Sequence, residues 1–581
     1  MNLSLDNVIN QKMHDIFNRL GLDTAYAVCK TSDRPDLSDF QCNGALALAK
    51  SLHKNPREIA IMIADEVKKD NCFAKVSVDG PGFLNMSITN EFIAEVLQQM
   101  ENDSDFGVQK ITQPQTVVLD YGGPNAAKAM HVGHLRAGVI GEAVRRIEKF
   151  IGNKVIGDVH LGDWGTPMGM ILAEIINHDG DLSKTETYDI NQITEFYKQA
   201  NIRCKEDETA KEQARIITAK LQDGEAEYRK AWQHLRKVSI EAIKENYDAL
   251  DVNFDLWWGE SDAHEMSFKV VDMAKEKGLA EMDDGALIMR LEEDNKPMPP
   301  IILIKRDGGF GYQITDIATI KRRVDEFNAQ EIYYFVDQRQ SLHFEQVFQA
   351  VEKLGIAPGV KMKHYGFGTV NGADGKPFKT RDGGVMTLEN LIKLSKDKVR
   401  ESMPAPNEVE GFGEKEIEKM VNQIAIGAIK FQDLKNNTAS GYVFDMEDFA
   451  KFDGKTGPYI QYAIARINSI LRKAQERNLA TGKIVINLPE ERELALKISQ
   501  LNTIVWRAHQ EKEPSIIADY AYTLAQIFSG FYNVAPIMSE ENTALASSRL
   551  TMAKLVRDIL KQMLYLLGIE APEVMLKKAE K

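Results

Sequence analysis

The chain has few cysteines and no long apolar run, and both absences restrict what it can be. Its four cysteines, Cys29, Cys42, Cys72 and Cys204, include no Cys-x-x-Cys pair, so we expect neither a structural zinc site nor a disulfide framework. No apolar stretch approaches the ~20 residues that a membrane-spanning helix needs. The N-terminus also lacks the charged-then-apolar pattern of a signal peptide. These features predict a cytoplasmic protein that does not contact membranes.

The chain also lacks an excess of positive charge. Its 86 Asp and Glu outnumber 72 Lys and Arg, giving a formal net charge of -14, which argues against a surface that coats nucleic acid. The 581 residues suggest about three to five domains, and 43% hydrophobic residues are typical of a globular protein. Any contact with nucleic acid is therefore expected to be local.

The middle of the chain alternates between predicted strands and helices. Residues 117–120 form a β-branched run, 139–151 carry apolar residues at helical spacing, and 154–160 form the next predicted strand, which completes one βαβ unit. The alternation resumes with a strand at 301–304, a helix at 316–327, a strand at 332–336, a helix at 342–354 and a strand at 364–370. The polar, mostly helical stretch 178–300 is therefore interpreted as an insertion into a Rossmann-like parallel sheet.

Two further domains are predicted beside this sheet domain, which we place at residues 113–403. Residues 1–112 combine alanine- and leucine-rich helices at 45–49 and 58–64 with strands at 73–78 and 83–88, which predicts a small α/β domain. Residues 404–581 predict an all-α bundle. Its helical patterns lie at 417–431, 459–474, 491–506, 516–532 and 547–567. The overall prediction is an α/β fold with three domains.

The junction between the first strand and the first helix carries the strongest chemical signal. His131, Gly133 and His134 form a His-x-Gly-His element there, and the unpaired N–H groups of a helix N-terminus suit phosphate. Gly133 would let a nucleotide approach the backbone. The same spacing would suit a metal pair or two half-exposed polar residues. The nearby Lys128 favours phosphate, because a triphosphate attracts a cation and a metal pair has no use for one.

A cationic loop follows the last predicted strand. Lys376, Lys379 and Arg381 lie between Gly372 and Gly384, and this spacing would allow the loop to close over a triphosphate. A solvated basic loop is the alternative. The His-x-Gly-His element in the same sheet favours a phosphate lid.

Polar residues also gather where other strands of the predicted sheet end, which is where such sheets bind ligands. Asp120 ends the first strand and Gln340 follows a later one, while Tyr312 and Asp316 share a face if their turn is helical. Carboxylates, an amide and a phenol suit a guanidinium, whose planar N–H donors they can accept. Asp316 alone could equally be a helix N-terminal charge. The prediction therefore depends on the group and on no single residue.

Together these motifs resemble the class I aminoacyl-tRNA synthetases, and within them the arginyl-tRNA synthetases. The His-x-Gly-His element resembles the HIGH motif, residues 124–130 and 160–166 resemble its arginine-specific surroundings, 41–43 with 55–60 resemble the family's N-terminal domain, and 457–463 resemble its anticodon-binding domain. The resemblance covers nearly the whole chain. It implies that arginyl-adenylate forms from L-arginine and ATP, with Mg2+ arriving on ATP. The arginyl group would then pass to tRNA(Arg), with release of AMP and pyrophosphate, and we expect a monomer.

The resemblance also implies a role for individual residues. Those implied to hold the substrate arginine are Asp120, Asn125, Tyr312, Asp316 and Gln340. Those implied to bind ATP are His131, Gly133, His134, Lys376, Lys379 and Arg381, and those implied to be catalytic are Lys128, His131, His134 and Lys379. Those implied to contact tRNA are Phe83, Asn85, Tyr459, Tyr462, Arg466 and Met575.

The chain departs from the family pattern at two places. The loop from Lys376 to Arg381 stands where other members carry KMSKS, and Lys128 is implied to supply the missing cation. Gly122 and Gly123 stand where many members have Ser-Ser, so a side-chain contact to the arginine is replaced by backbone or lost.

Two other functions stay open. The first is a nucleotidyltransferase that uses His-x-Gly-His without tRNA, which the N-terminal module and the long helical C-terminal part disfavour. The second is a non-catalytic tRNA-binding paralogue, which the intact Lys128, His131, His134 and Lys379 disfavour.

Overall fold

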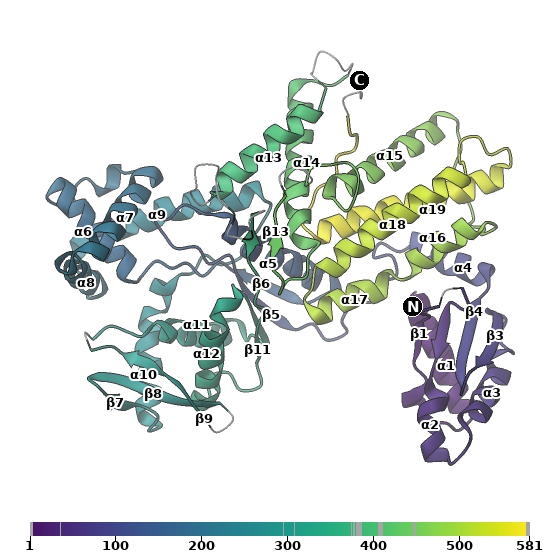
Figure 1. The fold of residues 1–581 in the computed structure, drawn as a ribbon, viewed down its shortest axis with the longest axis horizontal. Helices are drawn as coiled ribbons and strands as arrows, with labels where there is room; N and C mark the ends of the chain where they lie inside the picture. Colours follow the sequence, from purple (N-terminus) through teal and green to yellow (C-terminus); the bar gives the residue numbers. More distant parts are fainter. Residues whose placement is uncertain are drawn as a thin grey trace. The chain divides into compact units, whose positions relative to one another are not determined.

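The computed structural model describes residues 4–576 except 35, 294–295, 307, 373–374, 376–377, 379–385, 405–410 and 446–448. It divides into two compact units, each built from separated stretches of chain (Figure 1). The first unit comprises Met1–Lys110, Phe452–Tyr565 and Glu570–Lys577, and the second comprises mainly Ile111–Lys451 with Leu566–Ile569. The predicted domain boundaries at 112 and 403 stay predictions.

The centre of the second unit is a four-stranded parallel sheet with the strand order β11-β10-β5-β6 (Figure 1). Its strands are β5 (Thr116–Tyr121), β6 (Lys154–Asp158), β10 (Glu331–Phe335) and β11 (Lys361–His364). Asp120 of β5 pairs in register with Asp158 of β6 and with Tyr334 of β10. The carboxyl ends of three neighbouring strands therefore meet, as expected for a ligand site in such a sheet.

Three helices connect or flank these strands: α5 (Val132–Ile151), α11 (Tyr312–Phe327) and α12 (Ser341–Leu354). Val118, Ile317 and Val347 lie in one buried apolar cluster with no exposed surface, because strands of a parallel sheet are covered on both faces. Both α5 and α11 begin earlier than predicted, so that His131 caps α5 and Tyr312 starts α11. The predicted Rossmann-like sheet is confirmed, but its last strand runs from Lys361 to His364 instead of over the predicted 364–370.

The insertion combines helices with a small sheet. Its elements are α6 (Thr166–Asp179), α7 (Ile190–Glu206), α8 (Glu208–Gln222), α9 (Ala226–Ala249), α10 (His264–Glu276), β7 (Glu281–Asp283), β8 (Ala286–Glu293) and β9 (Lys296–Ile304). The last three form an antiparallel sheet of their own. Helices make up most of residues 178–300, as predicted, but the antiparallel sheet was not predicted, and residues 301–304 end β9 instead of joining the parallel sheet. An apolar run indicates a buried strand without indicating its partners.

The end of the second unit packs on α5. The helices α13 (Leu388–Ser402), which the sequence analysis did not predict, and α14 (Glu414–Leu434) both contact α5, and β12 (Val370–Asn371) pairs with β13 (Tyr442–Val443). Arg136 of α5 is buried, donates to the carbonyls of Gly368 and Ser440 at 2.8 Å, and forms an ion pair with Asp433 of α14 at 3.3 Å. These contacts hold α5 against the segment on either side of the cationic loop.

The first unit contains a four-stranded antiparallel sheet with the order β1-β2-β4-β3 (Figure 1). Its strands are β1 (Cys29–Thr31), β2 (Phe40–Cys42), β3 (Phe73–Asp79) and β4 (Phe83–Ile88), and its helices are α1 (Leu5–Arg19), α2 (Gly44–Leu52), α3 (Pro56–Val67) and α4 (Asn90–Glu101). The predicted helices and strands of this domain lie within these elements. The small α/β domain is confirmed.

The rest of the first unit is a helical bundle of α15 (Gly457–Glu476), α16 (Pro489–Ser499), α17 (Leu501–Glu511), α18 (Ser515–Val534) and α19 (Thr543–Leu566). The single helix predicted at 491–506 is wrong, because the chain breaks at Gln500 into α16 and α17. No glycine or proline marks this break, so the apolar pattern continues across it. Arg492 of α16 joins the bundle to the α/β sheet through Asp39 and the carbonyl of Ile88, at 2.5 and 2.9 Å.

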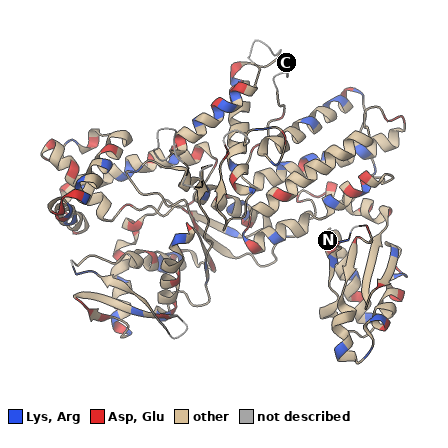
Figure 2. Ribbon diagram, in the orientation of Figure 1, with Lys and Arg blue, Asp and Glu red and all other residues tan. Residues whose placement is uncertain are grey.

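Lys and Arg are interspersed with Asp and Glu along the described helices of both units (Figure 2). Such mixing agrees with a protein whose contacts with an anionic partner are local. Among the described residues, no helix is long and apolar enough to cross a membrane.

Candidate active site

His131 and His134 stand together at the N-terminus of α5. Nδ1 of His131 accepts a hydrogen bond from the Gly133 N–H at 3.1 Å, and the His131 N–H donates to Nδ1 of His134 at 3.0 Å. The two ring centroids are 4.0 Å apart. Because Nδ1 of each ring accepts a hydrogen bond, a neutral ring carries its proton on Nε2. Each imidazole therefore offers one Nε2–H donor to a ligand.

Both rings are held in the neutral form. Burial lowers the pKa of His131, and the charge of Lys128 lowers it further. Burial, followed by the charges of His131 and Lys128, lowers the pKa of His134 to about 3. At neutral pH the two histidines are thus hydrogen-bond donors, and Lys128 supplies the positive charge beside them. The predicted grouping of these residues at a helix N-terminus is what the structure shows.

The residues that follow the cationic loop lie close to this element. Beyond the loop, the Val132 N–H donates to the carbonyl of Met386 at 3.2 Å and the Leu388 N–H donates to the carbonyl of Met130 at 3.0 Å. Lys376, Lys379 and Arg381 themselves lie outside the described residues. The described end of the loop is therefore paired directly with the segment that carries His131.

Tyr312 and Asp316 share one face of α11, as predicted, and both face His343 of α12. Nε2 of His343 lies 2.7 Å from Oδ2 of Asp316, and its ring centroid lies 4.8 Å from that of Tyr312. Nε2 of His160 lies 3.7 Å from Oδ1 of Asp316. Burial acts to raise the pKa of Asp316, but the His343 hydrogen bond and the nearby positive charges outweigh it and lower this pKa. Asp316 is therefore a buried, charged carboxylate at neutral pH.

A cavity of about 750 Å3 opens beside Tyr312 and is also lined by Asn125, Trp164 and Glu260. The sequence analysis missed Glu260, which lies far from Tyr312 in the chain and at no informative spacing from it. Burial raises the pKa of Glu260 to about 7; the charge of His160 opposes this rise, and the charges of Asp163 and Asp316 add to it. Carboxylates with perturbed pKa values in a cavity are typical of functional sites.

Asn125 and Gln340 are both exposed. Asn125 lines the cavity. Its backbone forms an isolated β-bridge with Gly162, whose carbonyl accepts a hydrogen bond from the Ala126 N–H at 3.0 Å. Gln340 ends the single turn η4 (Gln338–Gln340), just before the helix that carries His343. The structure thus brings Asn125 to the same cavity as Tyr312, and it places Gln340 at the start of the neighbouring helix.

Asp120 lies deeper than the sequence suggested. Its Oδ2 is 2.6 Å from Nη2 of Arg323, and the same nitrogen is 2.6 Å from Oδ2 of Asp158. Among the described residues, Asp120, Asp158 and His160 form one group whose ligand atoms lie within 4.8 Å of one another, as a metal site would need. Because the Arg323 guanidinium already provides the cation between the two carboxylates, we assign this group to an ion-pair network.

The Gly122 departure from the family pattern has a steric cause. Gly122 has φ +95, and a Cβ there would lie 2.7 Å from the hydroxyl of Tyr247 and 3.0 Å from the ring of Phe254. The Tyr247 hydroxyl also donates to the Gly122 carbonyl at 3.0 Å. A serine at this position would be strained and would displace Tyr247. At Gly123, by contrast, the nearest atom to a Cβ is 3.7 Å away.

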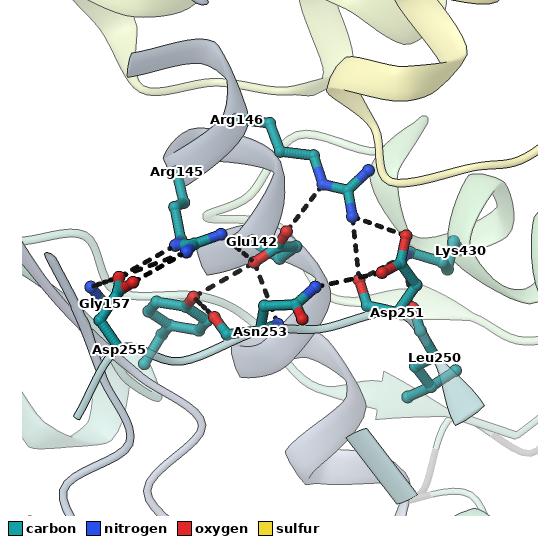
Figure 3. A network of polar contacts seen from close by, with 10 residues as sticks. Glu142, Arg145, Arg146, Gly157, Leu250, Asp251, Asn253, Asp255 and Lys430 are labelled. Atoms are coloured by element: carbon teal, nitrogen blue, oxygen red, sulfur yellow. Dashed lines mark hydrogen bonds and ion pairs between the residues drawn. The ribbon is translucent and has the colours of Figure 1, made fainter. Parts of the chain in front are cut away.

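A buried polar network holds α5 against the segment that follows α9 (Figure 3). Glu142 is 1% exposed and accepts hydrogen bonds from Nε of Arg146 at 2.7 Å, from the Tyr121 hydroxyl at 3.3 Å and from the Asn253 N–H at 3.2 Å. Arg146 also pairs with Asp251 at 2.6 Å. Because Tyr121 ends β5, this network fixes the strand end and α5 relative to each other.

Three of the predicted tRNA contacts lie on α15 of the first unit. Tyr462 is 42% exposed, while the half-buried Tyr459 lies with its ring centroid 5.4 Å from that of Tyr522. The guanidinium of Arg466 lies 4.7 Å from the ring centroid of Tyr532. Accessible aromatic rings with a nearby cation would suit stacking on unpaired bases.

Of the other predicted tRNA contacts, one is buried. Phe83 and Met575 are half-buried, and Asn85 is only 5% exposed. Oδ1 of Asn85 accepts a hydrogen bond from Gln41 at 2.9 Å and its Nδ2 donates to Asp79 at 2.8 Å. A contact from the Asn85 side chain to RNA would exchange one of these hydrogen bonds.

Three family models match the chain. The model described as tRNA synthetases class I (R), catalytic domain, matches residues 95–446. The Arginyl tRNA synthetase N terminal domain matches residues 4–88, and the DALR anticodon binding domain matches residues 460–575.

The chain is also similar to whole proteins. It is 42% identical to an arginine–tRNA ligase from Alkaliphilus oremlandii, over 98% of this chain and 99% of the relative, and 42% identical to one from Hyphomonas neptunium, over 96% and 98%. Its fold matches the arginyl-tRNA synthetase of Plasmodium falciparum with a TM-score of 0.81 at 26% identity, over 98% of this chain and 99% of the other. The fold of the Thermus thermophilus arginyl-tRNA synthetase matches with a TM-score of 0.78 at 23% identity, over 98% and 100%.

Proposed function

The chain belongs to the arginyl-tRNA synthetase family of ATP-dependent arginine–tRNA ligases, and we propose how its residues share out that reaction. The arginine carboxylate attacks the α-phosphate of ATP, pyrophosphate leaves, and a terminal ribose hydroxyl of tRNA then takes the arginyl group and releases AMP. The observation that carries the assignment is the pair of neutral Nε2–H donors at the N-terminus of α5, beside Lys128 and in the same unit as a cavity lined by Glu260 and Tyr312.

We propose that His131, Gly133 and His134 bind ATP together with Lys128. The helix N-terminus and the two Nε2–H donors favour the negative charge that grows on the phosphates as the bond to pyrophosphate breaks. We propose that Mg2+ arrives as part of the ATP substrate. Catalysis then consists of positioning and charge stabilisation, without a covalent enzyme intermediate.

The cationic loop is the proposed lid over these phosphates. Lys376, Lys379 and Arg381 would add positive charge, and the pairing of Met386 with Val132 supports the proposal by holding the loop end beside the histidines. Lys379 is the proposed catalytic cation of this loop.

We propose that Asp316, Tyr312 and Glu260 hold the guanidinium of the substrate arginine. Two carboxylates and a phenol can accept several of its five N–H donors, and His343 orients Asp316 for this task. Asp120, Asn125 and Gln340 complete the proposed arginine site.

We propose that tRNA(Arg) binds the first unit. In the α/β domain the proposed contacts are Phe83 and Asn85, and in the bundle they are Tyr459, Tyr462, Arg466 and Met575. The proposed functional domains are 1–112, 113–403 and 404–581, acting in one chain as a cytoplasmic monomer. We also propose that formation of the adenylate requires bound tRNA.

Amino-acid-dependent ATP–pyrophosphate exchange, measured with each of the twenty amino acids and with and without tRNA, tests this proposal. We expect exchange with arginine and with none of the other nineteen amino acids. This exchange should occur only when tRNA is present. Exchange with another amino acid would contradict the proposed pocket. Exchange that needs neither amino acid nor tRNA would indicate a nucleotidyltransferase.

Arginine binding is expected to strengthen with rising pH. The pKa of Glu260 is raised to about 7, so its carboxylate gains charge as the pH passes this value, and only the charged form attracts a guanidinium. The KM for arginine in the exchange assay should therefore fall about tenfold between about pH 6 and pH 8. Glu260→Gln should show a higher KM without this slope. A slope that persists in Glu260→Gln would assign the effect to another group, such as His160.

A further inference from the structure

Arg323 is a fully buried cation that no step proposed above uses. It lies on α11, about two helical turns beyond Asp316, and has no exposed surface. Its Nη2 donates to Asp120 and to Asp158 at 2.6 Å each, and its Nη1 donates to the hydroxyl of Tyr334 at 3.2 Å. Three neighbouring strands of the parallel sheet are therefore joined by one guanidinium.

The two carboxylates would repel each other without this cation. Asp120 and Asp158 are paired in register on adjacent strands and are 5% and 0% exposed. Burial raises the pKa of Asp120, the charge of Asp158 raises it further, and the charge of Arg323 opposes both. When two close, buried carboxylates lack a counter-ion, one of them takes up a proton. Arg323 thus favours the charged form of Asp120 and fixes one of its two oxygens.

The same arrangement places two acidic groups side by side. One contains Asp120 and Asp158, and the other contains Asp316 and Glu260, with His160 close to both: it lies 3.7 Å from Asp316, and it is influenced by the charge of Asp120. A guanidinium in the substrate would be attracted to either group. Because Arg323 fills the first group through Oδ2 of Asp120 and Oδ2 of Asp158, the second group is the one open to the substrate guanidinium, and Asp120 keeps its other oxygen for the rest of the arginine.

We propose that Arg323 is a positioning residue for arginine activation: it occupies the acidic pair of Asp120 and Asp158 and thereby directs the substrate guanidinium to Asp316 and Glu260. This inference rests on the proposed arginine site. Arg323 does not touch the substrate and acts through Asp120.

The inference predicts a selective loss of arginine binding in Arg323→Met. In tRNA-supported exchange the KM for arginine should rise about 10- to 100-fold, because Asp120 loses a charge-assisted hydrogen bond, while the KM for ATP stays unchanged, because the donors at α5 are untouched. Arg323→Lys keeps the charge but loses the planar fork, so its arginine KM should lie between those of the parent and Arg323→Met. Lys321→Met on the same helix, where Lys321 pairs with Asp325 at 3.0 Å, is the matched control and should leave both KM values unchanged.

A second variant separates positioning from folding. Arg323→Met leaves two unpaired carboxylates, and adding Asp158→Asn removes one of them. The double variant should therefore fold better than Arg323→Met, yet still show a raised arginine KM, because Asp120 still lacks the guanidinium that neutralises and orients it. Recovery of both the stability and the arginine KM in the double variant would overturn the inference and leave Arg323 a purely structural residue, as would equal rises in the KM values for arginine and ATP.

Asp316→Asn provides the reference for the site itself. If Asp316→Asn raises the arginine KM and Arg323→Met does not, the inference about Arg323 fails and the proposed site stands. If neither variant changes the arginine KM, the proposed site is wrong as well.

Discussion

Replacing His134 by alanine is expected to lower kcat of arginine-dependent ATP–pyrophosphate exchange by about 100- to 1,000-fold. Nδ1 of His134 is occupied by the His131 N–H at 3.0 Å, so the free Nε2–H is the atom that can donate to a phosphate. With a pKa lowered to about 3, the ring stays neutral, so the loss concerns a positioned donor and not a charge. The affinity for tRNA, measured by filter binding, should remain nearly unchanged.

Two conservative variants separate the role of the His134 Nε2–H as a donor to phosphate from the role of its Nδ1 in capping α5. In His134→Asn the amide oxygen can replace Nδ1 as the acceptor of the His131 N–H, so the helix start is kept while the Nε2 donor is lost. His134→Asn should therefore be nearly as inactive as His134→Ala but more stable. In His134→Gln the amide nitrogen can reach toward the position of Nε2, and more activity should remain. A His134→Ala protein that exchanged normally and lost tRNA binding would contradict the assignment of the site.

Asp316→Asn is expected to lower kcat/KM for arginine by about 150- to 5,000-fold, as the loss of one partner in a buried ion pair costs ~3–5 kcal/mol. The carboxylate is 9% exposed, accepts a hydrogen bond from His343 at 2.7 Å, and has a lowered pKa. It is thus already charged in the free protein and can pair with a cation without first losing a proton. An asparagine keeps the shape but removes the charge that selects a guanidinium.

The matched control for this change is Asp325→Asn on the same helix, whose carboxylate is 46% exposed and pairs with Lys321. Asp325→Asn should leave arginine activation unchanged. The measurement is exchange at varied arginine and at varied ATP. If Asp316→Asn raised the KM for ATP and not that for arginine, the proposed assignment of Asp316 to the arginine site would be wrong.

Local sequence was sufficient to predict which site residues lie together wherever those residues are neighbours in the chain. Lys128, His131 and His134 lie within one strand-loop-helix stretch, and Tyr312 and Asp316 share a helix face because they are four residues apart. In both cases the backbone geometry of a single element sets the spacing of the side chains. The same reasoning predicted the parallel sheet, the small α/β domain and the bundle.

Prediction failed where several structures satisfy one pattern. The apolar run at 301–304 has the composition of any buried strand, and it joins the antiparallel sheet of the insertion instead of the parallel one. The helical pattern at 491–506 continues across a break at Gln500 that no glycine or proline marks. In each case the choice depends on packing partners that are distant in the chain.

The sequence by itself determined that His131 and His134 stand at a helix N-terminus, where we propose that phosphate binds, that Tyr312 and Asp316 share one face of a helix, and that both lie in a Rossmann-like domain. Only the tertiary structure decided that Glu260 lines the cavity, that Tyr247 leaves no room for a side chain at Gly122, and that Arg323 neutralises Asp120 and Asp158. The physical reason is that charge compensation and steric exclusion act between atoms close in space, whereas sequence spacing reports only on atoms that share one helix or one strand.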